Sequence, residues 1–455
     1  MIKLIEYTMG DLEYYNQIIE EAVNEFGLDC YPQEFEICNY EDMLSYEAYS
    51  GMPSRYPHWS FGKAWERKKT FYRYNLTGLP YEMVINSNPC LAYLMKENTL
   101  SLQVLTIAHV YGHNDFFKNN RLFKDATRAE YTTEMFKSHA NRISDYIADP
   151  SIGYTRVERV IDAAHALRFQ VHRITNEKHL SPDEKKNKLM EKYYQSEQTK
   201  DSIFNKGKKG EEVPDWDKVP LEPEEDILLF LTQYARLAEW EKDIISIVRA
   251  EAQYFIPQIE TKIMNEGWAS YWHYKILKHL NLPQSIHLEF IKRHNQVIAS
   301  HPGTLNPYHL GFELFSKLDR ESEDSRKIFD IREQDRDVSF LRRYLDEELC
   351  RDLNLFEFYK DFSDYVVSEV SDEIGWKKIR DTLIMNVGMN GIPIIRVKEI
   401  GSQNILVLEQ EWDGRDLSLD YAHQTLKYIA RLWGDKVRLR VKIKEVYQLL
   451  ESDGN

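Results

Sequence analysis

The sequence predicts a mainly α protein, with a large helical bundle-like body and a small α+β domain at its C-terminus. Apolar residues recur at helical spacing over much of residues 91–282, whereas short apolar runs separated by glycines dominate after residue 381. Of the 455 residues, 42% are hydrophobic and 13% aromatic, which is enough for a sizeable core. We place the boundary at residue 307, so the predicted domains are 1–306 and 307–455.

Three regions of the body have distinct predictions. Residues 11–26 show helical spacing and end at Gly27, which predicts the first helix. Residues 31–80 are rich in aromatics but interrupted by Pro and Gly, which predicts a loop wrapped around the core. Residues 176–226 contain charge runs and prolines, which predict an exposed insertion, either a solvated linker or a docking strip.

The predicted C-terminal domain alternates strands with one helix. Its strands are expected at residues 384–387, 392–397, 405–408 and 437–441, and its amphipathic helix at 417–433. It contains no glycine-rich nucleotide-binding fingerprint. A binding or assembly module is therefore favoured over a second enzyme.

The charge balance limits the possible partners. There are 74 acidic against 59 basic residues, giving a formal net charge of -15, so no nucleic-acid partner is expected. No run approaches the ~18 consecutive apolar residues of a spanning helix, and the first residues lack the apolar region of a signal peptide. We therefore expect no membrane span and a cytoplasmic location. The four cysteines lack CxxC spacing, which argues against a thiolate zinc site or a disulfide framework.

A pair of histidines is the first candidate for chemistry. In residues 102–117, His109 and His113 fall on the same apolar stripe as Leu102, Leu105 and Phe116. Two imidazoles one helical turn apart can bind one divalent ion. The alternative is that both are ordinary core histidines with hydrogen-bond partners.

Glu266 is the second candidate, because it lies on an apolar stripe with Ile263 and Leu277. A buried carboxylate is costly unless it is paired, hydrogen-bonded or bound to a metal. An HxxxH helix with a later Glu is the ligand set of zinc peptidases, and it leaves a fourth position open. The alternative is that Arg, Tyr or Trp groups hold Glu266.

The general base of such a peptidase is missing from its usual place. Zinc peptidases of this type carry HExxH, but the residue after His109 is Val110. Glu158, Asp162 and His165 align on one face of another predicted helix, so Glu158 is a candidate base and His165 a further ligand. A solvated helix face would explain the same row. His273 and Glu251 are further catalytic candidates.

Several segments of the sequence are similar to sequences of one known family. They are YPHWSFGK at 56–63, YEMVINSNP at 81–89, AHVYGHNDFF at 108–117, DAAHAL at 162–167 and NEGWASYWH at 265–273. Together they resemble the bacterial stage V sporulation protein R family. The resemblance implies a cytoplasmic protein linked to formation of the spore cortex, a modified peptidoglycan. In non-sporulating bacteria it implies an envelope or stress role, often beside a serine kinase.

Taken together, these observations lead to the hypothesis of a zinc-dependent amide hydrolase that acts on peptidoglycan-related material. His109, His113 and Glu266 would hold the zinc, with cortex-assembly proteins or a serine kinase as partners. One alternative is a non-haem iron or di-iron carboxylate oxidase that also recruits the row from Glu158 to His165. Another is a non-catalytic cytoplasmic scaffold for cortex assembly.

Overall fold

The computed structural model describes residues 7–73, 82–173, 180–199, 216, 218–299, 304–361 and 364–454. The chain forms two compact units, Met1–Asp149 with Gln253–Gly391, and Pro150–Ala252 with Ile392–Asn455. Helix α10 (Glu239–Glu260) runs from the second unit into the first. The expected boundary at residue 307 coincides with the start of a helix of the first unit.

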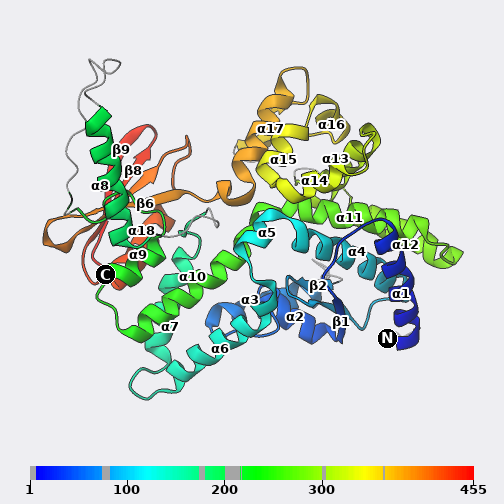
Figure 1. The fold of residues 1–455 in the computed structure, drawn as a ribbon, viewed down its shortest axis with the longest axis horizontal. Helices are drawn as coiled ribbons and strands as arrows, with labels where there is room; N and C mark the ends of the chain where they lie inside the picture. The colour runs from blue at the N-terminus through cyan, green and yellow to red at the C-terminus, as the bar shows by residue number, and fades with distance from the viewer. Residues whose placement is uncertain are drawn as a thin grey trace. The chain divides into compact units, whose positions relative to one another are not determined.

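Helices make up most of the first unit (Figure 1). They are α1 (Met9–Glu25), α2 (Tyr40–Ala48), α3 (Trp59–Arg73), α4 (Leu100–Asn119), α5 (Arg121–Ala126), α6 (Thr132–Ala148), α11 (Lys262–His279), α12 (Gln284–Val297), α13 (Pro307–Glu321), α14 (Lys327–Gln334), α15 (Asp337–Tyr344), α16 (Glu347–Asp352) and α17 (Gly375–Asn386). The mainly α fold class predicted from the sequence is confirmed.

Two small sheets complete the first unit. The strands β1 (Gln33–Cys38), β3 (Cys90–Met95) and β2 (Glu82–Ile85) lie in that order, with β1 parallel and β2 antiparallel to β3. β4 (Phe356–Asp361) and β5 (Asp364–Val370) form an antiparallel pair. β3 leads into α4 through a short turn, which places the edge strand β2 beside that helix.

The core of the first unit is built around α4 and α11, which lie against each other (Figure 1). The Thr99 hydroxyl caps α4 by accepting a hydrogen bond from the Leu102 amide at 3.3 Å. The Asp337 carboxylate accepts hydrogen bonds from the backbone amides of Ile263 and Met264, in the first turn of α11, at 2.9 Å each. A Cβ on Gly112 would lie 2.6 Å from the Ala269 Cα, so the two helices can approach this closely only because residue 112 is glycine.

The second unit joins helices to a four-stranded sheet. Its helices are α7 (Tyr154–Leu167), α8 (Pro182–Thr199), α9 (Ile227–Tyr234) and α18 (Leu419–Trp433). Its strands are β6 (Ile394–Ile400), β7 (Leu406–Glu411), β8 (Val437–Ile443) and β9 (Val446–Ser452), in the order β6-β7-β8-β9. β7 and β8 are parallel and joined through α18, which packs on β8, β9 and α7.

Two local predictions are wrong. Residues 31–73 form β1, α2 and α3 instead of an irregular loop, because their aromatic side chains pack between short regular elements; residues 74–80 lie outside the described part. The expected strand at 384–387 is the end of α17, where Ile384 is buried. On α4, residues 101–117 are all buried, so the whole helix surface contacts other protein groups.

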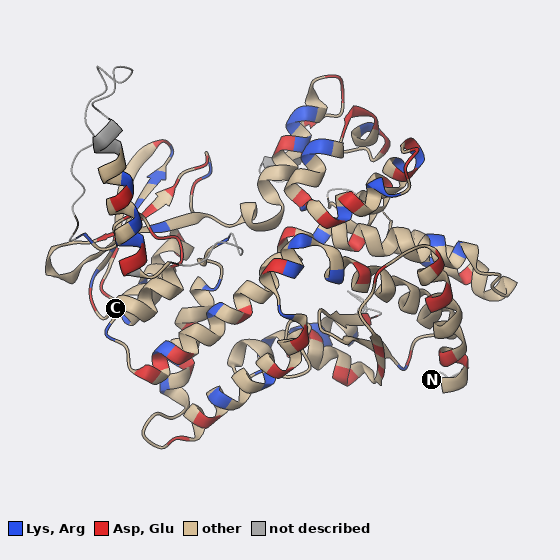
Figure 2. Ribbon diagram, viewed as in Figure 1, with Lys and Arg blue, Asp and Glu red and all other residues tan. Residues whose placement is uncertain are grey.

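The charged insertion is described only in part, because residues 174–179, 200–215 and 217 lie outside the described ranges. Acidic and basic side chains are interspersed along the described helices (Figure 2). Among the described residues, none of the helices combines the length and the apolar character that a membrane crossing requires.

Candidate metal centre

The two histidines of α4 and two carboxylates converge inside the first unit. The rings of His109 and His113 meet edge to face with centroids 4.6 Å apart, and the two residues are 3% and 6% exposed. Glu266 reaches them from α11 and Glu82 from the edge strand β2. Ligand atoms of Glu82, His109 and His113 all lie within 4.8 Å of one another.

The separations within this cluster suit a bound cation better than hydrogen bonds. The His109 Nε2 atom lies 3.8 Å from Glu82 Oε1 and 4.0 Å from Glu266 Oε2, and His113 Nε2 lies 3.5 Å from Glu266 Oε2. Hydrogen bonds require about 2.7–3.2 Å. Ligands about 2.1 Å from a tetrahedral ion are about 3.4 Å apart, close to the observed values.

Two carboxylate oxygens of the cluster are left unsatisfied. Glu82 Oε2 and Glu266 Oε2 are buried and have no hydrogen-bond partner within the described part of the chain. A buried acceptor without a partner costs roughly 1–3 kcal/mol, and more when it is charged. A divalent cation between the carboxylates and the imidazoles would remove this cost, so the residues fit a metal ion.

The outer hydrogen bonds of both histidines orient Nε2 toward the carboxylates. His113 Nδ1 donates to Asn265 Oδ1 at 2.9 Å, which leaves the lone pair on Nε2. His109 Nδ1 is 2.9 Å from His273 Nδ1. Ligating histidines are commonly held in this way through the second ring nitrogen.

Burial shifts the protonation of the cluster. It raises the pKa of the Glu82 carboxyl to about 8, and the nearby Glu266 charge adds to the shift. Burial also lowers the pKa of His109 well below its ordinary value, helped by the neighbouring His113 and His273. Both shifts follow mainly from burial, which disfavours the charged form of each group.

Solvent reaches the cluster from the carboxylate side. The side chains of Glu82 and Glu266 are 11% and 19% exposed, against 4% and 7% for His109 and His113. The two histidines are therefore the more enclosed part of the cluster and the two carboxylates the more exposed part.

The structure brings together some of the sequence-predicted site residues. His109, His113 and Glu266 meet, and His273 contacts His109. Glu158 and His165 are half-buried on α7, and Glu251 is buried on α10, all in the second unit.

Glu82 joins the cluster without having been a candidate. Its only sequence signal is its position in the segment YEMVINSNP, which contributed to the family resemblance. No spacing of residues in that segment indicates a contact with α4.

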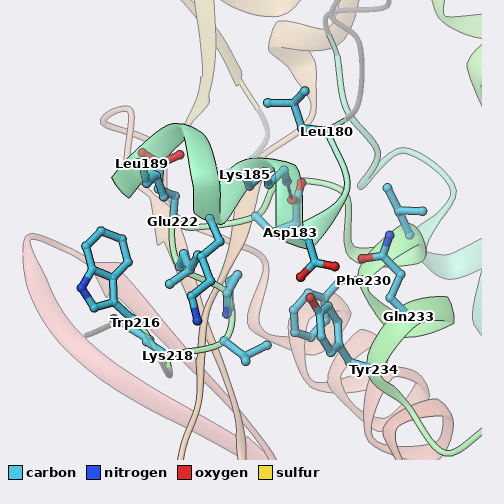
Figure 3. Close-up of a pocket in the computed structure, with 16 residues that line it drawn as sticks. Leu180, Asp183, Lys185, Leu189, Trp216, Lys218, Glu222, Phe230, Gln233 and Tyr234 are labelled. Atoms are coloured by element: carbon cyan, nitrogen blue, oxygen red, sulfur yellow. Dashed lines mark hydrogen bonds and ion pairs between the residues drawn. The ribbon is translucent and has the colours of Figure 1, made fainter. Parts of the chain in front are cut away.

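A separate cavity of about 210 Å³ lies in the second unit, between α8, α9 and the segment before α9 (Figure 3). Two of its lysines are paired with glutamates: Lys185 Nζ lies 2.5 Å from Glu224 Oε2, and Lys218 Nζ lies 3.3 Å from Glu399 Oε2. None of the predicted site residues lines it.

Comparisons with known proteins cover nearly the whole chain. Residues 6–392 match the family described as SpoVR like protein, and residues 392–444 match the SpoVR-like C-terminal domain. The chain is 34% identical over 474 residues to the Uncharacterized protein YcgB of Escherichia coli (strain K12), covering 95% of this chain and 92% of the relative. No solved structure matches it.

Proposed function

The chain belongs to the sporulation-related SpoVR family, and from this premise we propose that it is a zinc-dependent amide hydrolase acting on peptidoglycan-related material. His109, His113 and Glu266 are the proposed ligands, and Glu82 is the proposed general base. The link to sporulation comes from the family, and the peptide amides of peptidoglycan are the substrate class that suits a hydrolase in that process.

The position of the Glu82 carboxylate beside the cluster is the main support for the proposal. A zinc peptidase needs a carboxylate beside the metal to accept a proton from water, and the sequence has Val110 where that residue usually stands. Glu82 Oε1 lies 3.8 Å from His109 Nε2, on the solvent-facing side of the cluster. A carboxylate placed beside an attacking water can accept its proton.

In the proposed reaction, water attacks the amide carbon and the carbon–nitrogen bond breaks, which yields a carboxylate and an amine. Bound zinc polarises a carbonyl and lowers the pKa of its water to about 7. Glu82 accepts the proton from the attacking water and passes it to the departing amine. His113 is held by Asn265, and the close packing of α4 on α11 keeps bulk water from the histidine side.

The test compares two conservative variants of the carboxylates. Glu82→Gln should retain zinc and lower the release of amino groups from muropeptides by about 10²–10⁴-fold, because the base is lost while the ligands remain. Glu266→Gln should lose zinc and activity together, because a charged ligand is removed. Full hydrolysis by the Glu82→Gln protein would refute the assignment of the base.

A second function is favoured by the same ligand set. Two imidazoles with one carboxylate are also typical of non-haem iron sites, in which open positions bind oxygen. Metal analysis of the purified protein separates the two, since the hydrolase should contain about one zinc and the oxidase iron with visible absorption. A protein that is folded and binds neither ion would instead support the scaffold hypothesis.

A further inference from the structure

The four-stranded sheet of the second unit has two edges, and only one of them is covered. At the β6 edge, Val397 exchanges backbone hydrogen bonds with Glu224, at 2.7 and 3.0 Å. The Ile400 amide also donates to the Val219 carbonyl at 2.8 Å. The other edge is β9, and among the described residues none pairs with its outer side.

β9 also lacks the features that normally protect an edge strand from pairing with another chain. Such edges carry proline, lysine or a β-bulge. β6 has a bulge and contains Lys398, whereas residues 446–452 read VYQLLES and pair with β8 without a bulge. The apolar residues Val446, Tyr447 and Leu449 are 62%, 71% and 57% exposed. An apolar edge strand of this kind is a template for an added strand.

The turn between β8 and β9 determines which backbone groups of β9 are free. Lys444 and Glu445 form a two-residue turn with positive φ at both positions, so the flanking residues Ile443 and Val446 are a hydrogen-bonded pair. In an antiparallel ladder such pairs recur at every second residue. The even-numbered residues of β9 therefore bond to β8, and the odd-numbered residues direct their N–H and C=O groups outward.

The odd-numbered residues of β9 also share one face of the sheet. Leu450 lies opposite the buried Leu439 of β8, on the face that α18 covers. Because side chains alternate along a strand, Tyr447, Leu449 and Glu451 lie on the opposite face, where all three are exposed. The same three residues thus offer both free backbone groups and accessible side chains.

We propose that β9 pairs with β9 of a second copy of this chain, antiparallel and about a two-fold axis at Leu449. In this register Leu449 lies opposite Leu449 of the second copy, and Tyr447 lies opposite Glu451. Each of these pairs exchanges two hydrogen bonds, so every outward N–H and C=O group of the three residues is used. The contact joins the two four-stranded sheets into one and closes at two copies.

Length and charge both favour this register. Leu449 is the central residue of β9 (Val446–Ser452), so pairing about it uses the whole strand, and any slip shortens the ladder. Within the paired strands no two like charges lie opposite each other. Glu451 is held by Arg438, with 2.6 Å between Oε2 and Nε, and across the axis it meets Tyr447, whose neighbour on β8 is Lys442. The carboxylate therefore has a cation on each side.

Sedimentation equilibrium of the full chain tests the pairing. One strand from each copy makes a small interface, so the average mass should rise from monomer toward dimer between about 1 and 100 µM. Leu449→Lys sets two ammonium groups opposite each other on the axis and should stay monomeric throughout. Val367→Lys is the matched control, at a 52% exposed position on β5 in the first unit, and should behave like the wild type.

Two outcomes of this experiment would overturn the proposal. A wild-type chain that remains monomeric at the highest concentration would leave the β9 edge to an extended segment of a different protein. A Leu449→Lys chain that dimerises like the wild type would place the contact on another surface. The proposal is independent of the metal centre, so neither outcome bears on the proposed hydrolase.

Cysteine cross-linking tests the register, and it stays informative if Leu449→Lys fails to fold. Residues of a hydrogen-bonded antiparallel pair have Cα atoms about 5.5 Å apart, which a disulfide can span. Leu449→Cys treated with diamide should therefore form a covalent dimer. Glu451→Cys should not, because in the proposed register residue 451 lies opposite Tyr447. The wild type, with its four native cysteines, gives the background. Cross-linking above this background in neither variant, or to the same extent in both, would refute the pairing about Leu449.

Discussion

The contact between α4 and α11 and the outer face of α7 carry the same residue types at similar helical spacing, yet they differ in their surroundings. On α4 every residue from 101 to 117 is buried, so His109 and His113 can meet only other protein groups. On α7 the buried side is aliphatic, and Glu158 and His165 are half-buried at its margin. Tyr154 donates a hydrogen bond to Glu158 at 2.6 Å, so that carboxylate is satisfied locally.

The comparison shows that a polar pattern on one helix does not identify a site by itself. What distinguishes the first unit is that its carboxylate oxygens lack partners in a buried setting, whereas the row on α7 has a neighbour on its own helix and access to water. Whether a polar row on a helix forms a site therefore depends on how far the rest of that helix is buried, and this is set by the fold.

The strongest test of this difference between α4 and α7 is to remove one histidine from each helix. His113→Ala should weaken zinc binding by more than the roughly 10–100-fold that an outer hydrogen bond costs, because a direct ligand is lost. His165→Ala should leave the affinity unchanged. Isothermal titration with zinc measures both. Equal affinities of the two variants would show that α4 holds no metal.

The pH dependence of stability gives a second test of the difference between the buried cluster and α7. The folded-state pKa of Glu82, about 8, lies above its ordinary value of 4.5, so between these values the folded protein holds a proton that the unfolded chain has lost. Its contribution is therefore fully present below about pH 4.5 and is lost as the pH rises toward 8. The slope is at most about 1.4 kcal/mol per pH unit.

Chelator-treated wild-type protein should thus lose about 2 kcal/mol of unfolding free energy between pH 6 and 7.5 relative to Glu82→Gln. Urea denaturation at these pH values measures the difference. Glu158→Gln, the matched change on α7, should follow the wild-type curve. A Glu82→Gln protein with the wild-type pH dependence would contradict the buried environment of this carboxyl.

The close packing of α4 on α11 gives a third, smaller effect. Gly112→Ala would place a Cβ 2.6 Å from the Ala269 Cα, and the helices must separate to admit it. Overpacking of this kind typically costs about 1–3 kcal/mol. Gly62→Ala, on α3 with no atom within 4 Å of the added Cβ, should be neutral or slightly stabilising. Thermal unfolding compares them; equal melting temperatures would show that the helices do not approach this closely.

Sequence reasoning predicted those parts of the site that are local in the chain. The spacing of His109 and His113 and the position of Glu266 on an apolar stripe are properties of single helices, and the structure places these residues together. Glu82 lies on β2, which reaches α4 because it pairs with β3. Helical or strand periodicity within one segment cannot predict such a pairing.

The fold was predictable to a similar degree. The helical body and the C-terminal strands β6, β7 and β8 follow from periodicity, whereas β9 was missed because Val446, Tyr447 and Leu449 are exposed and give no clean alternation. The run at 384–387 was misassigned because a short, mostly apolar segment fits a strand and a helix end equally well.

The smallest expected effect concerns the row on α7 itself. Glu158→Ala removes the acceptor of the Tyr154 hydroxyl, a contact between residues four apart on an exposed helix face. Such pairs contribute about 0.2–0.5 kcal/mol, so the melting temperature should barely change and zinc content should not change at all. Glu158→Gln, which keeps an acceptor oxygen, should be indistinguishable from the wild type in both measurements. Loss of zinc in either variant would mean that α7 supplies a ligand or holds one in place. The distinction between the buried cluster and the α7 row would then fail. A half-buried helix margin would have built the metal site as well as the fully buried contact between α4 and α11.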